Sequence, residues 1–385
     1  MHISSKVKSV PASGIRKFFD IVSQMKDVIS LGVGEPDFVT PWRIREAAIY
    51  SIEKGYTTYT SNYGLIELRK LISSHIEKQF NLWYDPNNQI LVTVGVSEAI
   101  DLALRAMLEP GDEVIVPEPC FVAYKPCVIF AGGVPVAVGT DSSAGFAPAA
   151  DQIEKAVTPR TRAIMISFPN NPTGATMTQT ALQEIMDVAC KHDLYVITDE
   201  IYDKLIYEED HVCVAALKGA YERTVYLNGF SKAYAMTGWR IGYAAANPDL
   251  IEAMMKIHQY IMMCAPITAQ MAAIEALKNA EGDTRQMLTQ YTRRRRLIVD
   301  SLNEMGLDCF EPKGAFYAFP NVRCTGMTSE EFAERLLLEE KVAVVPGNAF
   351  GDCGEGHIRC CYATSLENIQ EAMKRMAAFT KRNTP

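Results

Sequence analysis

The sequence lacks the features that would point to a membrane or a nucleic acid. No stretch approaches 18 uninterrupted apolar residues, so no segment is predicted to span a bilayer. The N-terminal stretch has no long apolar core and does not predict a secretory signal. Lys and Arg number 38 against 46 Asp and Glu, a net charge of −8. Because nucleic acids and anionic membranes require a basic footprint, neither is expected as a main partner.

The cysteines lack the spacing of a metal site or of a disulfide framework. None of the ten forms a C-x-x-C pair, and Cys360 and Cys361 are adjacent, which suits neither a standard disulfide nor a zinc knuckle. We therefore expect ten reduced, mostly buried thiols, no metal, and a cytoplasmic location.

Two glycine-rich or basic segments also fall short of a binding motif. Gly32-Val-Gly34 lacks the third glycine of a dinucleotide loop, and Glu35-Pro36 follows where a helix should begin. The run of four arginines from Arg293 to Arg296 is short in an acidic chain, so it predicts a solvated helix face.

The main pattern that is present is an alternation of apolar strands with helices. The chain has 385 residues, 48% of them apolar, and its length corresponds to roughly 2.6 domains. A helix is predicted over 97–108, with Ser97 as its N-cap. Together these elements predict an α/β fold with about seven mostly parallel strands. The strands are expected at 89–94, 113–116, 134–138, 163–168, 194–198, 224–228 and 241–246.

The last hundred residues predict a separate α+β unit. The N-terminal forty residues are too irregular to fold alone, so we expect them to pack with this unit. The predicted division is a large domain at 44–281 and a small domain made from 1–43 and 282–385. Helices are expected at 293–305, 329–338 and 366–380, and strands at 314–319, 342–345 and 357–363.

One segment after a predicted strand carries the strongest chemical signal. The strand ends at Asn228, and Ser231, Lys232 and Arg240 follow within twelve residues. The neighbours of Lys232 are Gly, Phe, Ser, Ala, Tyr and Met, which suit a pocket wall better than a surface. A lysine beside a hydroxyl and an arginine at a sheet edge is typical of a Schiff-base lysine with a phosphate clamp.

Three further segments end strands in a way that suits the same ligand. Asp199 follows one strand, where open α/β sheets place functional groups. The turn-rich stretch 168–174 follows another and presents amide side chains. The turn at 95–97 begins a helix and offers backbone N–H groups to a phosphate.

These motifs resemble those of the class I aminotransferases of fold type I, which use pyridoxal 5′-phosphate. The resemblance runs from about Ile15 to Thr380. It rests on Asn-Pro-Thr-Gly, on Asp-Glu-x-Tyr and on Ser-Lys-x-x-x-x-Thr-Gly-Trp-Arg, with support from Gly-Val-Gly-Glu-Pro-Asp-Phe and Val-Pro-Gly-Asn-Ala-Phe-Gly. The chain looks most similar to the aromatic-aminotransferase-like branch of the gamma subgroup.

The resemblance implies a role at the cofactor for each matching residue. Lys232 would hold pyridoxal 5′-phosphate as a Schiff base, and Asp199 would pair with its pyridine nitrogen. With Tyr202 they form the expected catalytic set. The ring would also contact Asn171 and Tyr202 at O3′ and Phe121 on its face. The phosphate would be held by Ser231, Arg240 and the backbone at Val96 and Ser97.

The resemblance also implies residues for the substrate and for a second chain. Arg359 would grip the substrate α-carboxylate, which calls for a bidentate guanidinium. Gly34 and Asn171 would line the substrate side. Tyr59 matches a tyrosine that reaches the phosphate of the neighbouring subunit, so a homodimer is expected.

The expected reaction is a ping-pong transamination between an L-amino acid and a 2-oxo acid, with 2-oxoglutarate as the expected acceptor. Some aspartate-specific members have lysine at the position of Ser97, where it meets a distal carboxylate, so serine argues against a dedicated aspartate enzyme. We expect an aromatic donor. Alanine, aspartate, broad-range and N-acylated diamino acid donors stay open. Substrate shape would depend on scattered residues, namely Ile15, Tyr63, Tyr124 and Phe350, while 15–19 could form a lid and Arg16 a second cation.

Two rival functions share the fold. A lyase or decarboxylase would use the same lysine with different proton transfers, and it would keep turning over with amino acid alone. A non-enzymatic regulator would add an N-terminal DNA-binding helix domain, but the motif at 32–38 begins too early to leave room for one.

Overall fold

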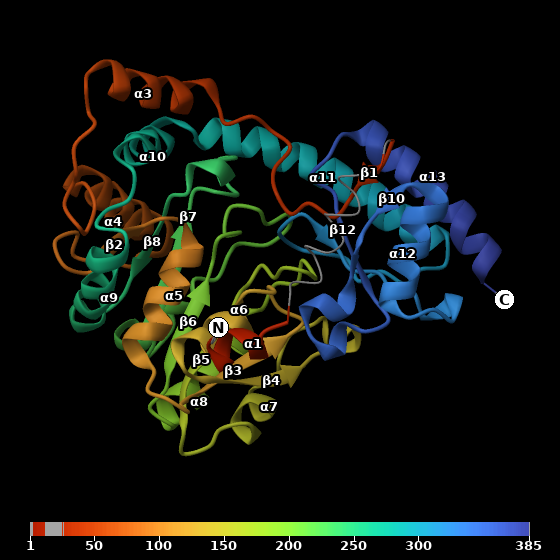
Figure 1. Cartoon of the computed structure of the whole chain (residues 1–385), viewed down its shortest axis with the longest axis horizontal. Coiled ribbons are helices and arrows are strands. Elements are labelled where there is room, and N and C mark those ends of the chain that lie inside the picture. The colour runs from red at the N-terminus through yellow and green to blue at the C-terminus, as the bar shows by residue number, and fades with distance from the viewer. Residues whose placement is uncertain (1–2, 12–24, 26, 385) are drawn as a thin grey trace.

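A seven-stranded sheet forms the centre of the molecule (Figure 1), which is a computed structural model describing residues 3–11, 25 and 27–384. The strand order is β2-β8-β7-β6-β5-β3-β4. Only β8 runs antiparallel to its neighbours, and the other pairs are parallel, so the predicted mostly parallel α/β sheet is confirmed. The strands are β2 (Ile90–Thr93), β3 (Glu113–Glu118), β4 (Val134–Gly139), β5 (Thr161–Ile166), β6 (Tyr195–Asp199), β7 (Thr224–Gly229) and β8 (Gly242–Ala245).

Helices cover both faces of this sheet. On β3, Val114 and Val116 pack in one apolar cluster and Ile115 in another, because successive strand residues point to opposite faces. Burial on both sides explains why the strands read as continuous apolar runs. The helices are α4 (Ile66–Phe80), α5 (Val96–Met107), α6 (Tyr124–Ala131), α7 (Ala150–Lys155), α8 (Gln179–Lys191), α9 (Pro248–Ile261) and α10 (Ile267–Asn279).

The two chain ends meet beside the sheet. Strand β1 (Ile29–Ser30) pairs in parallel with β10 (Val342–Ala343), so a red strand lies among the blue elements of Figure 1. The domain limits at 43 and 281 stay a prediction, which this pairing supports. The other elements are α1 (Ser5–Ser9), α3 (Trp42–Glu53), α11 (Glu281–Glu304), α12 (Ser329–Glu340), α13 (Leu366–Asn383), β9 (Tyr317–Ala318), β11 (Val345–Pro346) and β12 (Ile358–Cys361).

Two local predictions were wrong. Ser97 is not the N-cap of α5, because the chain turns at Gly95 (φ 76°) and the helix already begins at Val96. The strand expected over 314–319 is shortened to β9, since Ala315 has a positive φ of 56° and interrupts the extended backbone. The helix expected from residue 293 is the second half of α11, which is 24 residues long.

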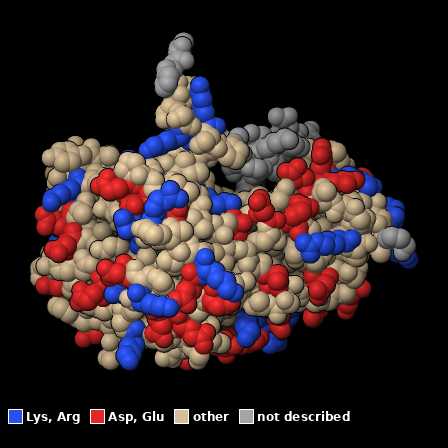
Figure 2. Space-filling model, turned by 90° about the horizontal axis from the view of Figure 1, so that it is seen from below, with Lys and Arg blue, Asp and Glu red and all other residues tan. Residues whose placement is uncertain are grey.

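The arginine run is not a solvated face. Arg293 and Arg296 are exposed, but Arg294 and Arg295 are buried. Each helix residue turns the chain by about 100°, so the middle pair faces inward. Both buried cations are paired: Arg294 binds Asp37 through two N–H groups at 2.7 and 2.9 Å, and Arg295 binds Glu208. On the face shown in Figure 2, basic and acidic side chains are intermixed.

All ten cysteines are free thiols. Five are buried and Cys324 is exposed, so burial is less general than predicted. Within residues 3–11 and 27–384, every helix is too short or too polar to traverse a lipid bilayer. The cytoplasmic location stays a prediction.

Candidate active site

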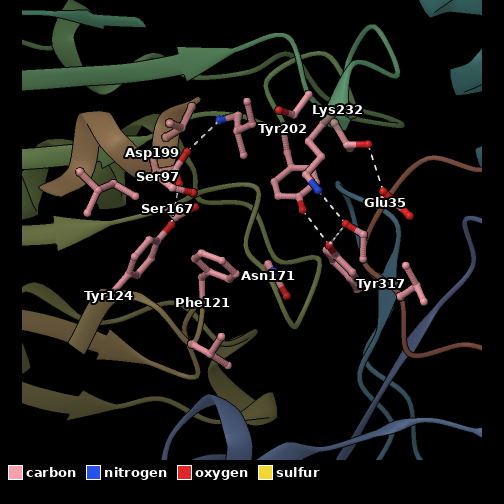
Figure 3. Close-up of a pocket in the computed structure, with 18 of the residues that line it drawn as sticks. Glu35, Ser97, Phe121, Tyr124, Ser167, Asn171, Asp199, Tyr202, Lys232 and Tyr317 are labelled. Carbon is pink, nitrogen blue, oxygen red and sulfur yellow. Dashed lines mark hydrogen bonds between the residues drawn. The ribbon is translucent and has the colours of Figure 1, made fainter. Parts of the chain in front are cut away.

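A cavity of about 490 Å³ lies at the carboxyl edge of the parallel strands, a volume typical of small-molecule sites. Figure 3 shows Asp199, Ser97 and Tyr124 on one side of it and Lys232 and Tyr317 on the other. Eleven of the twelve predicted site residues line the cavity: Gly34, Val96, Ser97, Phe121, Asn171, Asp199, Tyr202, Ser231, Lys232, Arg240 and Arg359.

Lys232 extends into the cavity from the loop after β7. Its Nζ donates a hydrogen bond of 2.6 Å to the carbonyl oxygen of Gly34. The same atom lies 5.8 and 5.7 Å from the ring centres of Tyr202 and Phe316. Burial lowers the pKa of Lys232 to about 8, because a low-dielectric site disfavours the charged form. A fraction of the amine is therefore neutral at physiological pH and available as a nucleophile or base.

Asp199 is the last residue of β6 and is 5% exposed. Burial raises its pKa to about 6, against the opposing hydrogen bonds from Tyr124 and Ile201. The Tyr124 hydroxyl donates to Oδ2 at 2.8 Å and the Ile201 N–H donates to Oδ1 at 3.2 Å. At neutral pH the cavity therefore contains a buried carboxylate, which can hold a proton on a ligand nitrogen.

Hydrogen-bond donors for an anion gather around the N-terminus of α5. Helix α5 begins at Val96 after Gly95, and the first N–H groups of a helix have no intrahelical acceptor. A Cβ at Gly95 would lie 2.6 Å from Nη2 of Arg240, so only glycine lets the guanidinium approach this turn. Arg240 is held by a 2.9 Å bond from Nη1 to the Thr237 carbonyl, and Ser231 lines the same wall. This set of donors suits a phosphate group.

Arg359 occupies the other end of the cavity and is 3% exposed. Its Nη1 donates to Oδ1 of Asn171 at 2.9 Å, and its Nη2 donates to the Gly32 carbonyl at 2.6 Å. The guanidinium lies 4.7 and 4.8 Å from the ring centres of Tyr317 and Phe350. Among the described residues, its Nε has no hydrogen-bond partner. A buried cation held in this way can bind a carboxylate with little loss of side-chain entropy.

Two tyrosines that line the cavity, Tyr202 and Tyr317, are hydrogen-bonded to each other. The hydroxyls of Tyr202 and Tyr317 are 2.7 Å apart, and burial raises the pKa of both. A Cβ at residue 34 would lie 2.7 Å from the Tyr317 hydroxyl, so Gly34 is required for this packing. Tyr317 lies in an apolar run and carries no sequence signal of a functional residue. Ser167, which also lines the cavity, directly follows β5 and could have been found by the strand-end rule.

Of the other residues named from the sequence, Tyr124 lines the cavity, whereas Tyr59, Tyr63 and Phe350 do not. Tyr59 is 79% exposed and does not line the cavity of its own chain. Phe350 lies behind Arg359, and Tyr124 binds Asp199 instead of shaping a distant substrate pocket. Tyr63 packs at the edge of the core. Ile15, Arg16 and the 15–19 segment fall outside the described residues.

Comparisons with known proteins agree in one family. The profile described as aminotransferase class I and II matches residues 26–376. The aspartate aminotransferase of Pyrococcus abyssi is 48% identical, covering 98% of this chain and 97% of its own. Aromatic-amino-acid aminotransferase 2 of Thermococcus litoralis is 44% identical, covering 99% of each chain. The crystal structure of the aromatic aminotransferase from Pyrococcus horikoshii OT3 matches with a TM-score of 0.91 at 47% identity, covering 95% of this chain and 99% of that one.

Proposed function

We propose a substrate pair for this chain, which belongs to the class I and II aminotransferases, enzymes that depend on pyridoxal 5′-phosphate. The chain transfers the amino group of an aromatic L-amino acid to 2-oxoglutarate. We further propose a ping-pong order, in which one site serves both the donor and the acceptor. The observation that carries this proposal is the meeting of Lys232, Asp199 and Arg359 around one cavity.

The residues around the cavity fit the cofactor. Gly95 and Gly34 leave room where a Cβ would meet Arg240 or Tyr317. We assign the phosphate to Ser231, Arg240 and the N–H groups of Val96 and Ser97. We assign the pyridine nitrogen to Asp199, the ring oxygen O3′ to Asn171 and Tyr202, the ring face to Phe121, and the covalent attachment to Lys232.

The bound cofactor supplies an electron-accepting ring, and the protein supplies the proton transfers. Arg359 holds the α-carboxylate, which orients the Cα–H bond toward the amine of Lys232. That amine, with its pKa lowered to about 8, can accept the Cα proton and deliver it to C4′ on the same face. Asp199, an anion at neutral pH, keeps a proton on the ring nitrogen.

The preference for an aromatic donor rests on the cavity wall. Ser97 stands where a lysine would pair with a distal carboxylate in aspartate-specific members of the family. Val33, Ile100 and Val122 add apolar surface to the same cavity. Relatives named for aspartate and for aromatic substrates are similarly identical to this chain, at 48% and 44%, so identity alone does not decide between them.

We propose that the active unit is a homodimer in which Tyr59 reaches the cofactor phosphate of the partner subunit. In a single chain Tyr59 is 79% exposed, which is unusual for a large aromatic residue. The nearby segment 260–263, which comprises the end of α9 and the two residues after it, is also apolar and exposed. The Asn62 side chain donates a 2.8 Å hydrogen bond to the Met263 carbonyl and holds the two segments together. The exposed side chains of that segment are Tyr260, Ile261, Met262 and Met263.

A panel of single half-reactions tests the substrate proposal. Each amino acid is mixed with the holoenzyme in the absence of an oxo acid, and the loss of visible absorbance from the bound cofactor is followed. We expect phenylalanine and tyrosine to react about tenfold faster than aspartate or alanine, and the signal to stop after one turnover per site. Equal or faster reaction with aspartate would overturn the aromatic assignment.

A further inference from the structure

A buried carboxylate and a buried imidazole lie directly behind the turn that begins α5. Glu98, the third residue of the helix, folds back so that its Oε2 accepts a 2.5 Å hydrogen bond from the Val94 N–H. Its Oε1 lies 2.7 Å from Nδ1 of His258, which belongs to α9. Since a carboxylate only accepts, the Nδ1 atom of His258 must carry the proton.

The burial of this pair is poorly explained by stability alone. The side chain of His258 is fully buried and that of Glu98 is 7% exposed. Within the described part of the chain, Nε2 of His258 has no hydrogen-bond partner. An unpartnered buried nitrogen costs free energy that an apolar side chain of the same size would avoid. What an apolar side chain could not supply is the hydrogen bond to Glu98.

The role of that hydrogen bond follows from the neighbourhood of Glu98. Glu98 is two residues from Val96 and adjacent to Ser97, and these two residues line the cavity end assigned to a phosphate. A carboxylate free to turn toward that end would repel the phosphate or take its donors. The bond to His258 holds the carboxylate on the opposite side, where it fixes the Val94 N–H.

We propose, on the basis of the cofactor site proposed above, that His258 is a positioning residue for the cofactor phosphate. Through Glu98, it fixes the turn from Val94 to Val96 so that the first N–H groups of α5 point at the phosphate. His258 itself does not line the cavity.

A second buried pair of histidine and glutamate, next to Asp199, serves as a matched control. His211 and Glu200 form a second buried pair, with Nε2 and Oε2 2.5 Å apart and exposed fractions of 6% and 1%. Glu200 follows Asp199, and its Oε1 accepts bonds of 3.0 Å from Thr198 and from the Val214 N–H. This pair adjoins Asp199 at the pyridine end, and in the described part of the chain neither side chain forms a hydrogen bond to residues 94–98.

The test compares pyridoxal 5′-phosphate with pyridoxal, which lacks the phosphate. Both are titrated into the full-length chain after removal of the cofactor, and the dissociation constants are read from the visible absorbance of the bound form. The dissociation constant of pyridoxal divided by that of pyridoxal 5′-phosphate measures the contribution of the phosphate, so weaker phosphate binding lowers this ratio. We expect His258→Leu to lower that ratio about tenfold, equivalent to a loss of 1.4 kcal/mol of phosphate binding.

Two variants separate positioning from general damage. His258→Asn retains a donor near the position of Nδ1 and should restore the ratio to within about threefold of the parent. Glu98→Ala introduces a good helix former, so it should fold even where His258→Leu does not, and it should also lower the ratio about tenfold. His211→Leu should weaken both ligands alike and leave the ratio unchanged.

The outcomes distinguish this inference from the proposed function. If the parent chain binds pyridoxal 5′-phosphate but His258→Leu and Glu98→Ala keep its ratio, the positioning role is wrong and the function stands. If both variants lose pyridoxal as strongly as the phosphate ester, the pair is only structural and the inference is again overturned. If the parent chain binds neither ligand, the proposed cofactor site itself fails.

Discussion

The two ends of the cavity are built in different ways. At the cofactor end, Asp199 is the last residue of β6 and Lys232 follows β7, and these two strands are neighbours in the sheet. At the carboxylate end, Arg359 comes from β12, Gly34 from the segment after β1, and Tyr317 from β9. The first end is a product of one sheet edge, whereas the second requires segments from both ends of the chain.

This difference separates two kinds of preorganisation. Asp199 and Lys232 are poised by burial, which moves the pKa of each toward neutrality from opposite directions. Arg359 is poised by contacts, since two hydrogen bonds and two aromatic rings hold its guanidinium before any substrate arrives. The cofactor end thus controls proton transfer, and the carboxylate end controls substrate orientation. Substitutions at the two ends should therefore change different kinetic parameters.

Loss of the lysine should give the largest effect. Lys232→Ala removes both the attachment point and the proton carrier, so kcat should fall by about 10⁴-fold or more. The measurement is steady-state transamination with the best donor of the half-reaction panel. Binding of the amino acid at the Arg359 end should persist, because the guanidinium of Arg359 is held by Asn171 and Gly32 and not by Lys232. Substantial turnover in this variant would remove the lysine from the mechanism.

A substitution at the carboxylate end should act mainly on KM. Arg359→Lys keeps the positive charge but loses the planar fork, so kcat/KM for the amino acid should fall about 100-fold through KM. The dissociation constant of pyridoxal 5′-phosphate serves as the control and should change less than about threefold. A parallel loss of cofactor affinity would contradict the separation of the two ends.

The cofactor end could be predicted because it depends on local sequence. Continuous apolar runs marked the strands, and turn formers marked their ends, so Asp199 and Lys232 were expected on one sheet edge. The strand at 314–319 failed for a local reason that the pattern does not encode, namely the positive φ of Ala315.

The supporting contacts could not be predicted because they join residues distant in the sequence. Tyr124 and Asp199 are 75 positions apart, Tyr202 and Tyr317 are 115 apart, and the Glu98–His258 pair spans 160. None of these partners stands in a motif with its mate. The same limitation explains the error on the arginine run, since Asp37, the carboxylate that pairs with Arg294, lies 257 positions away.

The smallest predicted effect concerns the hydrogen bond from Tyr124 that lowers the pKa of Asp199. Tyr124→Phe removes the 2.8 Å hydrogen bond to Asp199 and leaves the ring in place. That bond favours the carboxylate, so its loss raises the pKa of Asp199 above about 6. Because the anion is the active form, the acidic limb of the kcat/KM profile should move to higher pH by about one unit.

The sign of this shift sets where the loss of activity is visible. With a one-unit rise, the anionic fraction of Asp199 falls about fivefold near pH 6 but hardly changes near pH 8, so Tyr124→Phe should resemble the parent enzyme only in the alkaline range. Tyr207→Phe is the matched control, since the Tyr207 hydroxyl bonds to the Ala315 carbonyl away from Asp199. It should leave the acidic limb in place. A uniform loss of activity at every pH in Tyr124→Phe would mean that the tyrosine shapes the site and that its hydrogen bond does not control the charge of Asp199.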